Sequence, residues 1–422
     1  MIRRRRPLLA YVAAQGISVT GTRISTIALP WFALTTTGSA TKTGLVAFAE
    51  MAPLVAFQAL SGPLADRVSP RRLAIACNAC SILAVAAIPL THATGVLTFP
   101  LLLVLVAVAG ALRGPGDAAQ HAMTPAVADQ TGTDLSRVTG LAGAVERTAS
   151  LTGAGIAAGL IGLLGPADAL LVDAGSFLVA AVLLLAFTDD GAVRERSSGE
   201  SYLGELRAGW TFMRRDPILM GLAVMIAVTN LLDQAWSAVL VPVWARDSGA
   251  GVAGIGVIGV VWGVAAVAGS ACAAAAAHRL PRFAVFVGGF LVAGLPRYAA
   301  LALHLPWPAL CAVLVAGGFG SGFLNPILGA VMFERIPREM VGRASAMSVA
   351  MSWSLMPFGG ILGGVLIAGI GISPALLVVG AAYFLATMSP VLDKRLRGMD
   401  EAPQGAPELA RVDGAATPSH AA

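Results

Sequence analysis

Gly62-Pro63-Leu64-Ala65-Asp66-Arg67-Val68-Ser69-Pro70-Arg71-Arg72 is the stretch that decides the fold of this chain. It connects two apolar segments, 43–65 and 73–92. Each is long enough to cross a bilayer, whose roughly 30 Å hydrocarbon core requires about 20 helical residues. Arginine side chains are costly inside hydrocarbon, so the connection marks one side of a membrane. The two flanking segments are therefore predicted to be membrane-spanning helices.

Arginine and lysine recur in every second connection along the chain. This set holds 22 of the 28 basic residues: Arg3–Arg6, Arg67, Arg71, Arg72, Arg137, Arg194, Arg196, Arg207, Arg214, Arg215, Arg279, Arg282, Arg335, Arg338, Arg343, Lys394, Arg395, Arg397 and Arg411. The alternate connections contain only Lys42 and Arg246, and the remaining four basic residues lie inside or at the ends of apolar segments. Cytoplasmic loops hold the cations of membrane proteins. The pattern predicts an even number of spans with both termini in the cytoplasm.

Composition supports the same class of protein. The chain is 57% hydrophobic and 12% charged, whereas a soluble domain has about 25% charged residues. The net charge of +5 would suggest nucleic acid for a soluble protein, but these cations flank apolar spans and fit anionic lipid head groups. No catalytic triad, phosphate-binding loop or metal-ligand spacing is visible. We expect no enzyme activity, cofactor, metal or nucleic-acid partner.

A window of bilayer length gives twelve predicted spans. They are 9–34, 43–65, 73–92, 97–120, 139–164, 168–187, 218–244, 252–277, 283–304, 308–333, 346–370 and 374–392. The fold class is an all-α polytopic membrane protein of two pseudo-symmetric six-helix bundles. The domains are predicted to be 1–187, a cytoplasmic linker 188–217 with an amphipathic helix, 218–393, and a disordered cytoplasmic tail 394–422.

Glycines at G-x-x-x-G spacing predict close helix packing within these bundles, because small residues let backbones approach in lipid. The pairs are Gly155 with Gly159, Gly259 with Gly263, Gly359 with Gly363, and Gly360 with Gly364.

Three motifs carry a resemblance to a known family. The stretch 62–72 resembles the loop motif between helices 2 and 3 of the major facilitator superfamily. Residues 17–31 and 171–177 are similar to its branch of macrolide and siderophore exporters, which are drug:proton antiporters. The resemblance implies a major facilitator fold of twelve transmembrane helices, with a central cavity open alternately to each side.

The resemblance also implies that the loop is a gating motif, formed by Gly62, Asp66, Arg67, Arg71 and Arg72. An acid at this place can cap a neighbouring helix N-terminus, and the family implies the eleventh helix, which begins near Ser345. The arginines can pair with Asp129 and Asp134. The alternative is that these charges only set the topology.

Polar residues inside the spans predict a central cavity. Arg23 in the first span and Asp233 in the seventh lie on helices that line the cavity in this family, and we hypothesise an ion pair between them. The alternative is that each finds a partner within its own half. The substrate-cavity candidates are Arg23, Thr22, Asn230, Gln234, Trp236 and Trp262. For the two tryptophans the alternative is core packing.

Four residues are candidates for proton coupling: Glu50, Asp173, Asp233 and Arg113. A carboxylate in a low-dielectric site binds a proton more readily. For Asp173 the alternative is a structural hydrogen bond. The family implies proton transfer for Arg113, and the alternative is an i, i+4 pair with Asp117.

The sequence thus predicts a monomeric, multi-pass transporter of the inner (plasma) membrane that exports a small amphipathic compound in exchange for protons. Two alternatives stay open: an importer or facilitator of the same fold, and a transport-inactive membrane sensor. The first stays open because Ala154 follows Gly153 where drug antiporters of this family have proline.

Overall fold

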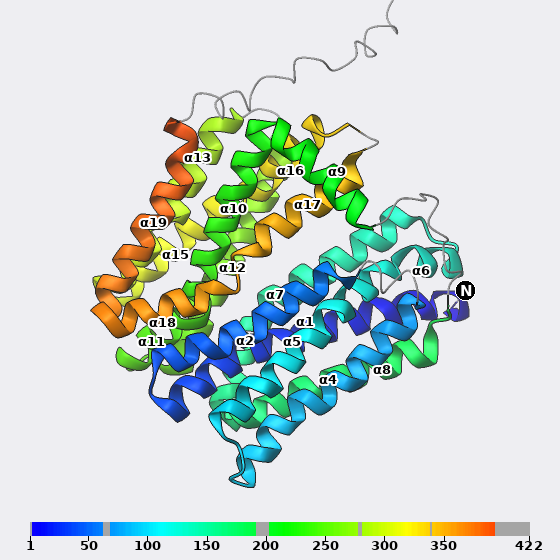
Figure 1. Cartoon of the computed structure of the whole chain (residues 1–422), viewed down its shortest axis with the longest axis horizontal. Coiled ribbons are helices and arrows are strands. Elements are labelled where there is room, and N and C mark those ends of the chain that lie inside the picture. Colours follow the sequence, from blue (N-terminus) through cyan, green and yellow to red (C-terminus); the bar gives the residue numbers. More distant parts are fainter. Residues whose placement is uncertain (1, 62–67, 191–201, 277–280, 338–339, 393–422) are drawn as a thin grey trace, which may run out of the picture.

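A computed structural model describes residues 2–61, 68–190, 202–276, 281–337 and 340–392 (Figure 1). All regular secondary structure in these residues is helical. Three predicted gating residues, Gly62, Asp66 and Arg67, lie outside the described residues, and so does the predicted disordered tail 394–422.

The first half of the chain folds into one bundle of long helices, the N bundle. Its helices are α1 (Ile2–Thr37), α2 (Ala40–Ala59), α4 (Pro70–Ala93), α5 (Phe99–Ala122), α6 (Thr124–Thr131), α7 (Leu135–Leu164) and α8 (Pro166–Phe187). α1 packs against α7 and α8, α2 against α5, and α4 against α5 and α8. Pro30, Pro53, Pro89 and Pro115 lie inside helices that continue past them.

The second half forms the C bundle, in which four of the six predicted spans are interrupted. Its helices are α10 (Pro217–Ala235), the π-helix η1 (Trp236–Leu240), α11 (Val241–Asp247), α12 (Gly251–Ala276), α13 (Arg282–Ala293), α14 (Leu295–Ala302), α15 (Trp307–Ser321), α16 (Leu324–Arg335), α17 (Val341–Ser354), α18 (Phe358–Ile370) and α19 (Ile372–Leu392). A proline lies at or just after each interruption: Pro242, Pro296, Pro326 and Pro357. Proline cannot donate a backbone hydrogen bond and its ring clashes with the preceding turn, which favours these breaks.

The helices account for the predicted spans. Among the described residues, eleven helical segments are long and apolar enough to cross a membrane. The remaining predicted span is α1, which lies within the N bundle against α7 and α8. Its arginines and its polar residues, among them Gln15, Ser18 and Thr22, make it less apolar than the others.

The predicted amphipathic helix of the linker is α9 (Tyr202–Arg215). Its buried face packs against α17 and α10 of the C bundle. The Met213 side chain is 1% exposed, and a Cβ added at Gly209 would lie 2.5 Å from the Arg343 carbonyl oxygen. This contact fixes the rotation of α9, so that its other face is exposed.

The two bundles meet at the end of the molecule that is poor in arginine. There α18 packs on α2, and α12 packs on α7 (Figure 1). A Cβ at Gly44 would lie 2.2 Å from the Gly360 carbonyl oxygen, so the two backbones nearly touch. Arg246 Nη1 donates to the Gly38 carbonyl oxygen across the same junction, at 3.1 Å.

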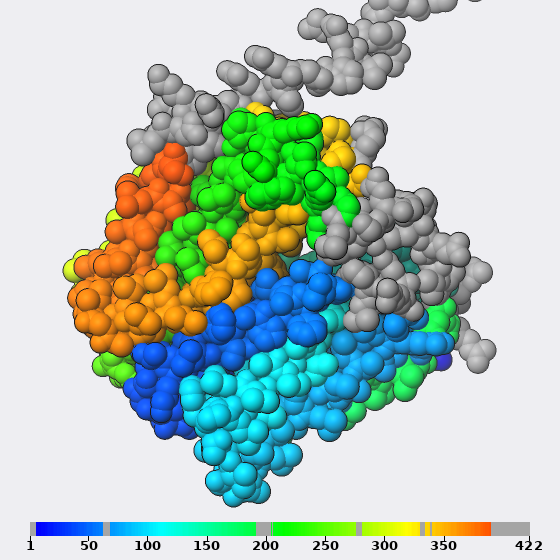
Figure 2. Space-filling model, in the orientation of Figure 1, coloured from blue at the N-terminus to red at the C-terminus, as the bar shows by residue number. Residues whose placement is uncertain are grey.

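Toward the opposite, Arg-rich end, which carries α9 and the start of α1, the two bundles part. Figure 2 shows a hollow between α17 and α2, beneath α9. Among the predicted glycine pairs, Gly360 and Gly364 make the close contacts to α2, and Gly259 and Gly263 make those to α7. The prediction is wrong for Gly159, where an added Cβ would meet no atom within 4 Å.

Candidate functional site

A cavity of about 560 Å³ lies where the two bundles meet. It is lined by residues Arg23, Ile226, Thr229, Asn230, Asp233, Gln234, Trp236, Ser237, Ile258, Gly259, Trp262, Phe290, Ala293, Arg297, Leu314, Ser321, Leu324, Asn325, Leu328, Met356 and Tyr383. Arg23 comes from the N bundle, and the others come from the C bundle. Five of the six cavity candidates are in this set; Thr22 is not. Because the bundles part toward the Arg-rich end, the cavity opens in that direction.

The helix breaks of the C bundle supply the walls of this cavity. Trp236 belongs to the π-helix, Arg297 follows the break at Gly294, Asn325 is the second residue of α16, and Met356 lies between α17 and α18. Irregular backbone at membrane depth is tolerated only where protein covers it or where it lines a water-filled cavity. Substrate sites of secondary transporters are commonly built from such discontinuous helices. The breaks therefore mark the cavity as the candidate substrate site.

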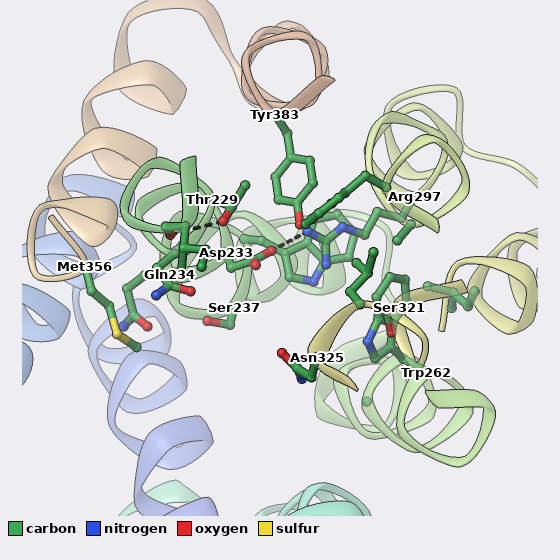
Figure 3. Close-up of a pocket in the computed structure, with 18 of the residues that line it drawn as sticks. Thr229, Asp233, Gln234, Ser237, Trp262, Arg297, Ser321, Asn325, Met356 and Tyr383 are labelled. Carbon is green, nitrogen blue, oxygen red and sulfur yellow. Dashed lines mark hydrogen bonds and ion pairs between the residues drawn. The ribbon is translucent and has the colours of Figure 1, made fainter. Parts of the chain in front are cut away.

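Asp233 and Arg297 form an ion pair in the cavity wall (Figure 3). Arg297 Nη2 donates to Asp233 Oδ1, and also to the Tyr298 hydroxyl at 3.1 Å. The Arg297 side chain is only 7% exposed, whereas that of Asp233 is 43% exposed. The carboxylate is therefore the member of the pair that a ligand in the cavity can reach.

Four aromatic rings surround the Arg297 guanidinium. Its central carbon lies 4.8–5.0 Å from the ring centroids of Trp236, Trp262, Tyr298 and Tyr383. A cation over an aromatic face gains about 0.5–2 kcal/mol, and more where water is excluded. The rings and Asp233 together explain how a guanidinium can be kept inside the span.

The hypothesised pair between Arg23 and Asp233 is wrong for this structure. Arg23 Nη2 instead donates to Ser150 Oγ of α7 at 3.0 Å, and Asp233 pairs with Arg297 of α14. Each residue has a partner within its own bundle, as the alternative predicted. The main contacts between the bundles are α2 with α18 and α7 with α12, and α1 contacts the seventh span at η1 and α11, which follow Asp233 in the chain.

Glu50 and Arg113 form a second ion pair, which is buried inside the N bundle. Arg113 Nη1 lies 2.9 Å from Glu50 Oε1, and the side chains are 15% and 6% exposed, respectively. A Cβ at Gly110 would lie 2.1 Å from the Glu50 carbonyl oxygen, so only glycine lets α5 approach α2 closely enough here. Asp117 is a weaker partner, 4.0 Å from Arg113 Nε. The i, i+4 alternative therefore describes the lesser contact of Arg113.

Asp173 joins α8 to α1 within the same bundle. Its carboxylate accepts hydrogen bonds from Ser25 Oγ and from Ser176 Oγ, the latter at 3.2 Å. The side chain is buried. This arrangement matches the structural alternative, with the difference that the partners are side-chain hydroxyls.

Arg71 and Arg72 are the described members of the predicted gating motif, and both contact the end of α8. Arg71 donates to the carbonyl oxygens of Leu184 and Leu185, at 3.3 and 2.8 Å, and so caps a helix C-terminus. Arg72 Nε lies 2.9 Å from Asp190 Oδ2. The predicted pairing with Asp129 and Asp134 is wrong for Arg71 and Arg72, because the acid that faces both of them is Asp190. Arg67 lies outside the described residues.

Each bundle also has an ion pair between its own residues at the Arg-rich end. In the N bundle, hydrogen bonds from Ser69 and Arg72 lower the pKa of Asp190. In the C bundle, Arg282 of α13 makes a two-pronged contact with Glu334 of α16, at 2.6 and 2.9 Å, which lowers the pKa of Glu334.

Sequence reasoning missed Arg297, Tyr298, Tyr383 and Asn325. A signal for Arg297 was available, because it stands in an apolar segment with no acid within four residues on either side. An arginine so placed requires a partner from another helix.

Comparison with known proteins decides the family. A sequence profile of the Major Facilitator Superfamily matches residues 11–236 and 224–412. The chain belongs to the major facilitator superfamily. It is a membrane transporter, and the expectation that it is not an enzyme is confirmed by its relatives and by the proteins that share its fold.

Multidrug efflux pumps are similar to this chain along nearly its whole length. The multidrug efflux pump Tap of Mycolicibacterium fortuitum is 26% identical over 402 residues, which cover 94% of this chain and 98% of that protein. Tap of Mycobacterium tuberculosis is 25% identical over 405 residues, with 95% and 96% covered.

Among solved structures, the nucleoside transporter NupG has a TM-score of 0.72 at 14% identity, covering 95% of this chain and 100% of that one. A bacterial homologue of the human lysosomal transporter Spinster, in an inward-facing and unoccupied conformation, has a TM-score of 0.70 at 15% identity, covering 92% and 97%. At these identities the likeness concerns the fold.

Proposed function

We propose that this chain exports small amphipathic compounds from the cytoplasm in exchange for protons. The observation that carries the proposal is the cavity between the bundles, with one half-exposed carboxylate among aromatic and apolar side chains. The similarity to multidrug efflux pumps along nearly the whole chain supports export of this class of compound.

The cavity suits a substrate that is both lipophilic and polar. Trp262, Phe290 and Met356 offer apolar and aromatic surface. The Asp233 carboxylate is held by Arg297 on one oxygen and can accept a hydrogen bond or a positive charge from the substrate on the other. Asn230 and Gln234 add polar groups about one helical turn or less away on the same helix.

Glu50 and Arg113 are the proposed coupling pair. Both are buried away from the cavity, so protons and substrate have separate sites. Protonation of Glu50 neutralises the carboxylate and frees the Arg113 guanidinium, which then needs another partner, and Asp117 stands next to it. The pair joins α2 to α5, and α2 also carries the main contact to the C bundle through α18. A change in this pair can therefore shift α2 and alter its contact with α18 at the junction between the bundles.

The orientation follows from the arginine distribution. If the Arg-rich end is cytoplasmic, the chain sits in the plasma membrane with both termini inside, and this conformation is open to the cytoplasm. Export then requires that α18 part from α2 while the Arg-rich ends of the bundles come together, which is alternating access.

Transport in liposomes tests the proposal. The purified chain is reconstituted with its Arg-rich end outside, and an acidic lumen stands for the outside of the cell. A cationic amphipathic dye such as ethidium, shown first to be exported in a host without its own pumps, is added externally. We expect the dye to accumulate in the lumen only while the pH gradient lasts. Accumulation should be lost in Glu50→Gln and kept in Glu334→Gln, a matched control at the Arg-rich end.

Three outcomes would overturn the proposal. Equilibration of the dye without regard to pH indicates a facilitator, and pH-driven movement toward the Arg-rich end indicates an importer, the alternative that Ala154 leaves open. Binding of the dye without any movement indicates a sensor.

A further inference from the structure

The exposed face of α9 carries cations that no part of the proposed transport cycle uses. Arg207, Trp210, Thr211, Arg214 and Arg215 are exposed at i, i+3, i+4, i+7 and i+8 spacing, which places them on one side of the helix. The opposite side is the one buried against α17 and α10. Packing in the C bundle thus holds this cationic face outward.

A groove of about 510 Å³ lies between α9 and the start of α17. Arg207 and Arg215 line it at either end, about 12 Å apart along the helix axis, with Thr211 between them. Phe212 and Met340 provide its apolar sides. The groove therefore combines two guanidinium groups with a surface that can cover hydrocarbon.

The two guanidinium groups are available to a ligand. Within the part of the chain that the structure describes, no ion pair forms on Arg207 or Arg215. The adjacent acid, Asp216, has other partners. Its Oδ1 accepts hydrogen bonds from the backbone N–H groups of Ile218 and Leu219 and so caps α10, and its Oδ2 lies 3.5 Å from Arg335 Nη1. The Thr211 hydroxyl donates to the Arg207 carbonyl oxygen, so recognition of an anion falls to the two arginines.

The groove also lies next to the beginning of a predicted membrane span, where lipid head groups are expected. Arg215 is two residues before Pro217, where the apolar span Pro217–Asp247 begins. Trp210 is 40% exposed and lies beside Arg214, whose guanidinium carbon is 5.8 Å from the ring centroid. Exposed tryptophan next to arginine is typical of the membrane–water interface.

We propose that this groove binds the phosphate group of an anionic phospholipid from the leaflet at the Arg-rich end. Arg207 and Arg215 contact the phosphate through charge-assisted hydrogen bonds, and arginine suits this geometry. Phe212 and Met340 cover the glycerol and the first carbons of the acyl chains. The lipid then ties the linker between the bundles to the membrane surface.

Lipid binding by the full-length protein tests this proposal without any transport measurement. The protein in a neutral detergent is titrated with phosphatidylglycerol or phosphatidylcholine, and bound lipid is counted by native mass spectrometry. Each arginine near an anionic surface contributes about a factor of five, so Arg207→Gln with Arg215→Gln should weaken phosphatidylglycerol binding about 30-fold. The matched control, Arg6→Gln with Arg137→Gln, removes the same charge from exposed positions of the N bundle. It should bind like wild type.

Three results would overturn the proposal. One is equal loss in both double variants, which means diffuse attraction and no built site. Another is equal binding of phosphatidylcholine. The third is full competition by millimolar inorganic phosphate, which means that the groove takes a soluble anion. Unfolding temperatures in phosphatidylcholine check that both double variants are folded as the wild type is.

Discussion

The two bundles differ in whether their helices continue past proline and in whether their intramembrane ion pair is buried. In the N bundle, five prolines (Pro7, Pro30, Pro53, Pro89 and Pro115) lie inside helices that stay continuous, and the ion pair within its spans, Glu50 with Arg113, is buried. In the C bundle, prolines accompany breaks in four spans, and its ion pair, Asp233 with Arg297, faces a cavity. The comparison suggests a division of labour: the C bundle shapes the substrate site, and the N bundle holds the charges that respond to protons.

The largest expected effect comes from breaking the buried pair. Glu50→Gln leaves Arg113 with only Asp117 at 4.0 Å, and stranding one member of a buried pair costs about 3–5 kcal/mol. We expect a clear fall in the unfolding temperature in detergent, together with loss of proton-driven transport.

Asp233→Asn is the matching change in the C bundle, and its effect on stability should be smaller. Arg297 keeps its four aromatic rings, and Asp233 is already half exposed. Equal destabilisation by the two variants, measured in parallel melts, would contradict the difference drawn between the bundles.

A methyl group at the junction should shift the conformation. Gly44→Ala places a Cβ 2.2 Å from the Gly360 carbonyl oxygen, and such overpacking costs about 1–3 kcal/mol. The conformation that is closed at the Arg-poor end should become about 5- to 150-fold less populated, relative to the conformation that is closed at the Arg-rich end.

Spin labels on Ser136 and Arg214, one on each bundle at the Arg-rich end, measure this shift after the free cysteines are replaced: Cys77, Cys80, Cys272 and Cys311. The distance between the labels should shorten in Gly44→Ala. Gly140→Ala is the control, since its Cβ meets no atom within 4 Å. An unchanged distance distribution in Gly44→Ala would mean that the glycine contact does not hold the bundles together.

The smallest effects are expected at the ion pairs of the Arg-rich end. Asp190 and Glu334 each have a pKa lowered by their partners, so each contributes stability above its unfolded pKa of about 4. That contribution is lost as the pH falls through the lower pKa of the folded state. Asp190→Asn and Glu334→Gln should each cost less than about 1 kcal/mol at neutral pH.

Because the two acids lie in different bundles, the changes that their substitutions cause in the free energy of unfolding should add. The free energy of unfolding of the double variant, measured from acidic to neutral pH, should lack the pH dependence that these two acids contribute. Strong coupling between the two sites would show that the bundles communicate at the Arg-rich end in this conformation.

The sequence was sufficient for the overall architecture and for much of the cavity. Length and apolarity of the segments identify the spans, and the i, i+3, i+4 stripe on the seventh span places Asn230, Asp233 and Gln234 on one face, as the cavity lining confirms.

Partners could not be read from the sequence, because they depend on which helices pack together. Glu50 meets Arg113 because Gly110 admits α2, and Asp233 meets Arg297 because α14 follows a break. Proline did not predict the breaks, since Pro53 and Pro115 interrupt nothing. The residues 62–67 of the gating motif lie outside the described residues, so their predicted role stays a prediction.

The most direct test of the division of labour is counterflow exchange in liposomes without a pH gradient, compared with pH-driven accumulation of the same dye. Glu50→Gln should still exchange labelled for unlabelled dye across the membrane and fail only in pH-driven accumulation, whereas Asp233→Asn should fail in both. Exchange that survives in Asp233→Asn and is lost in Glu50→Gln would contradict the assignment of substrate to the C bundle and of protons to the N bundle.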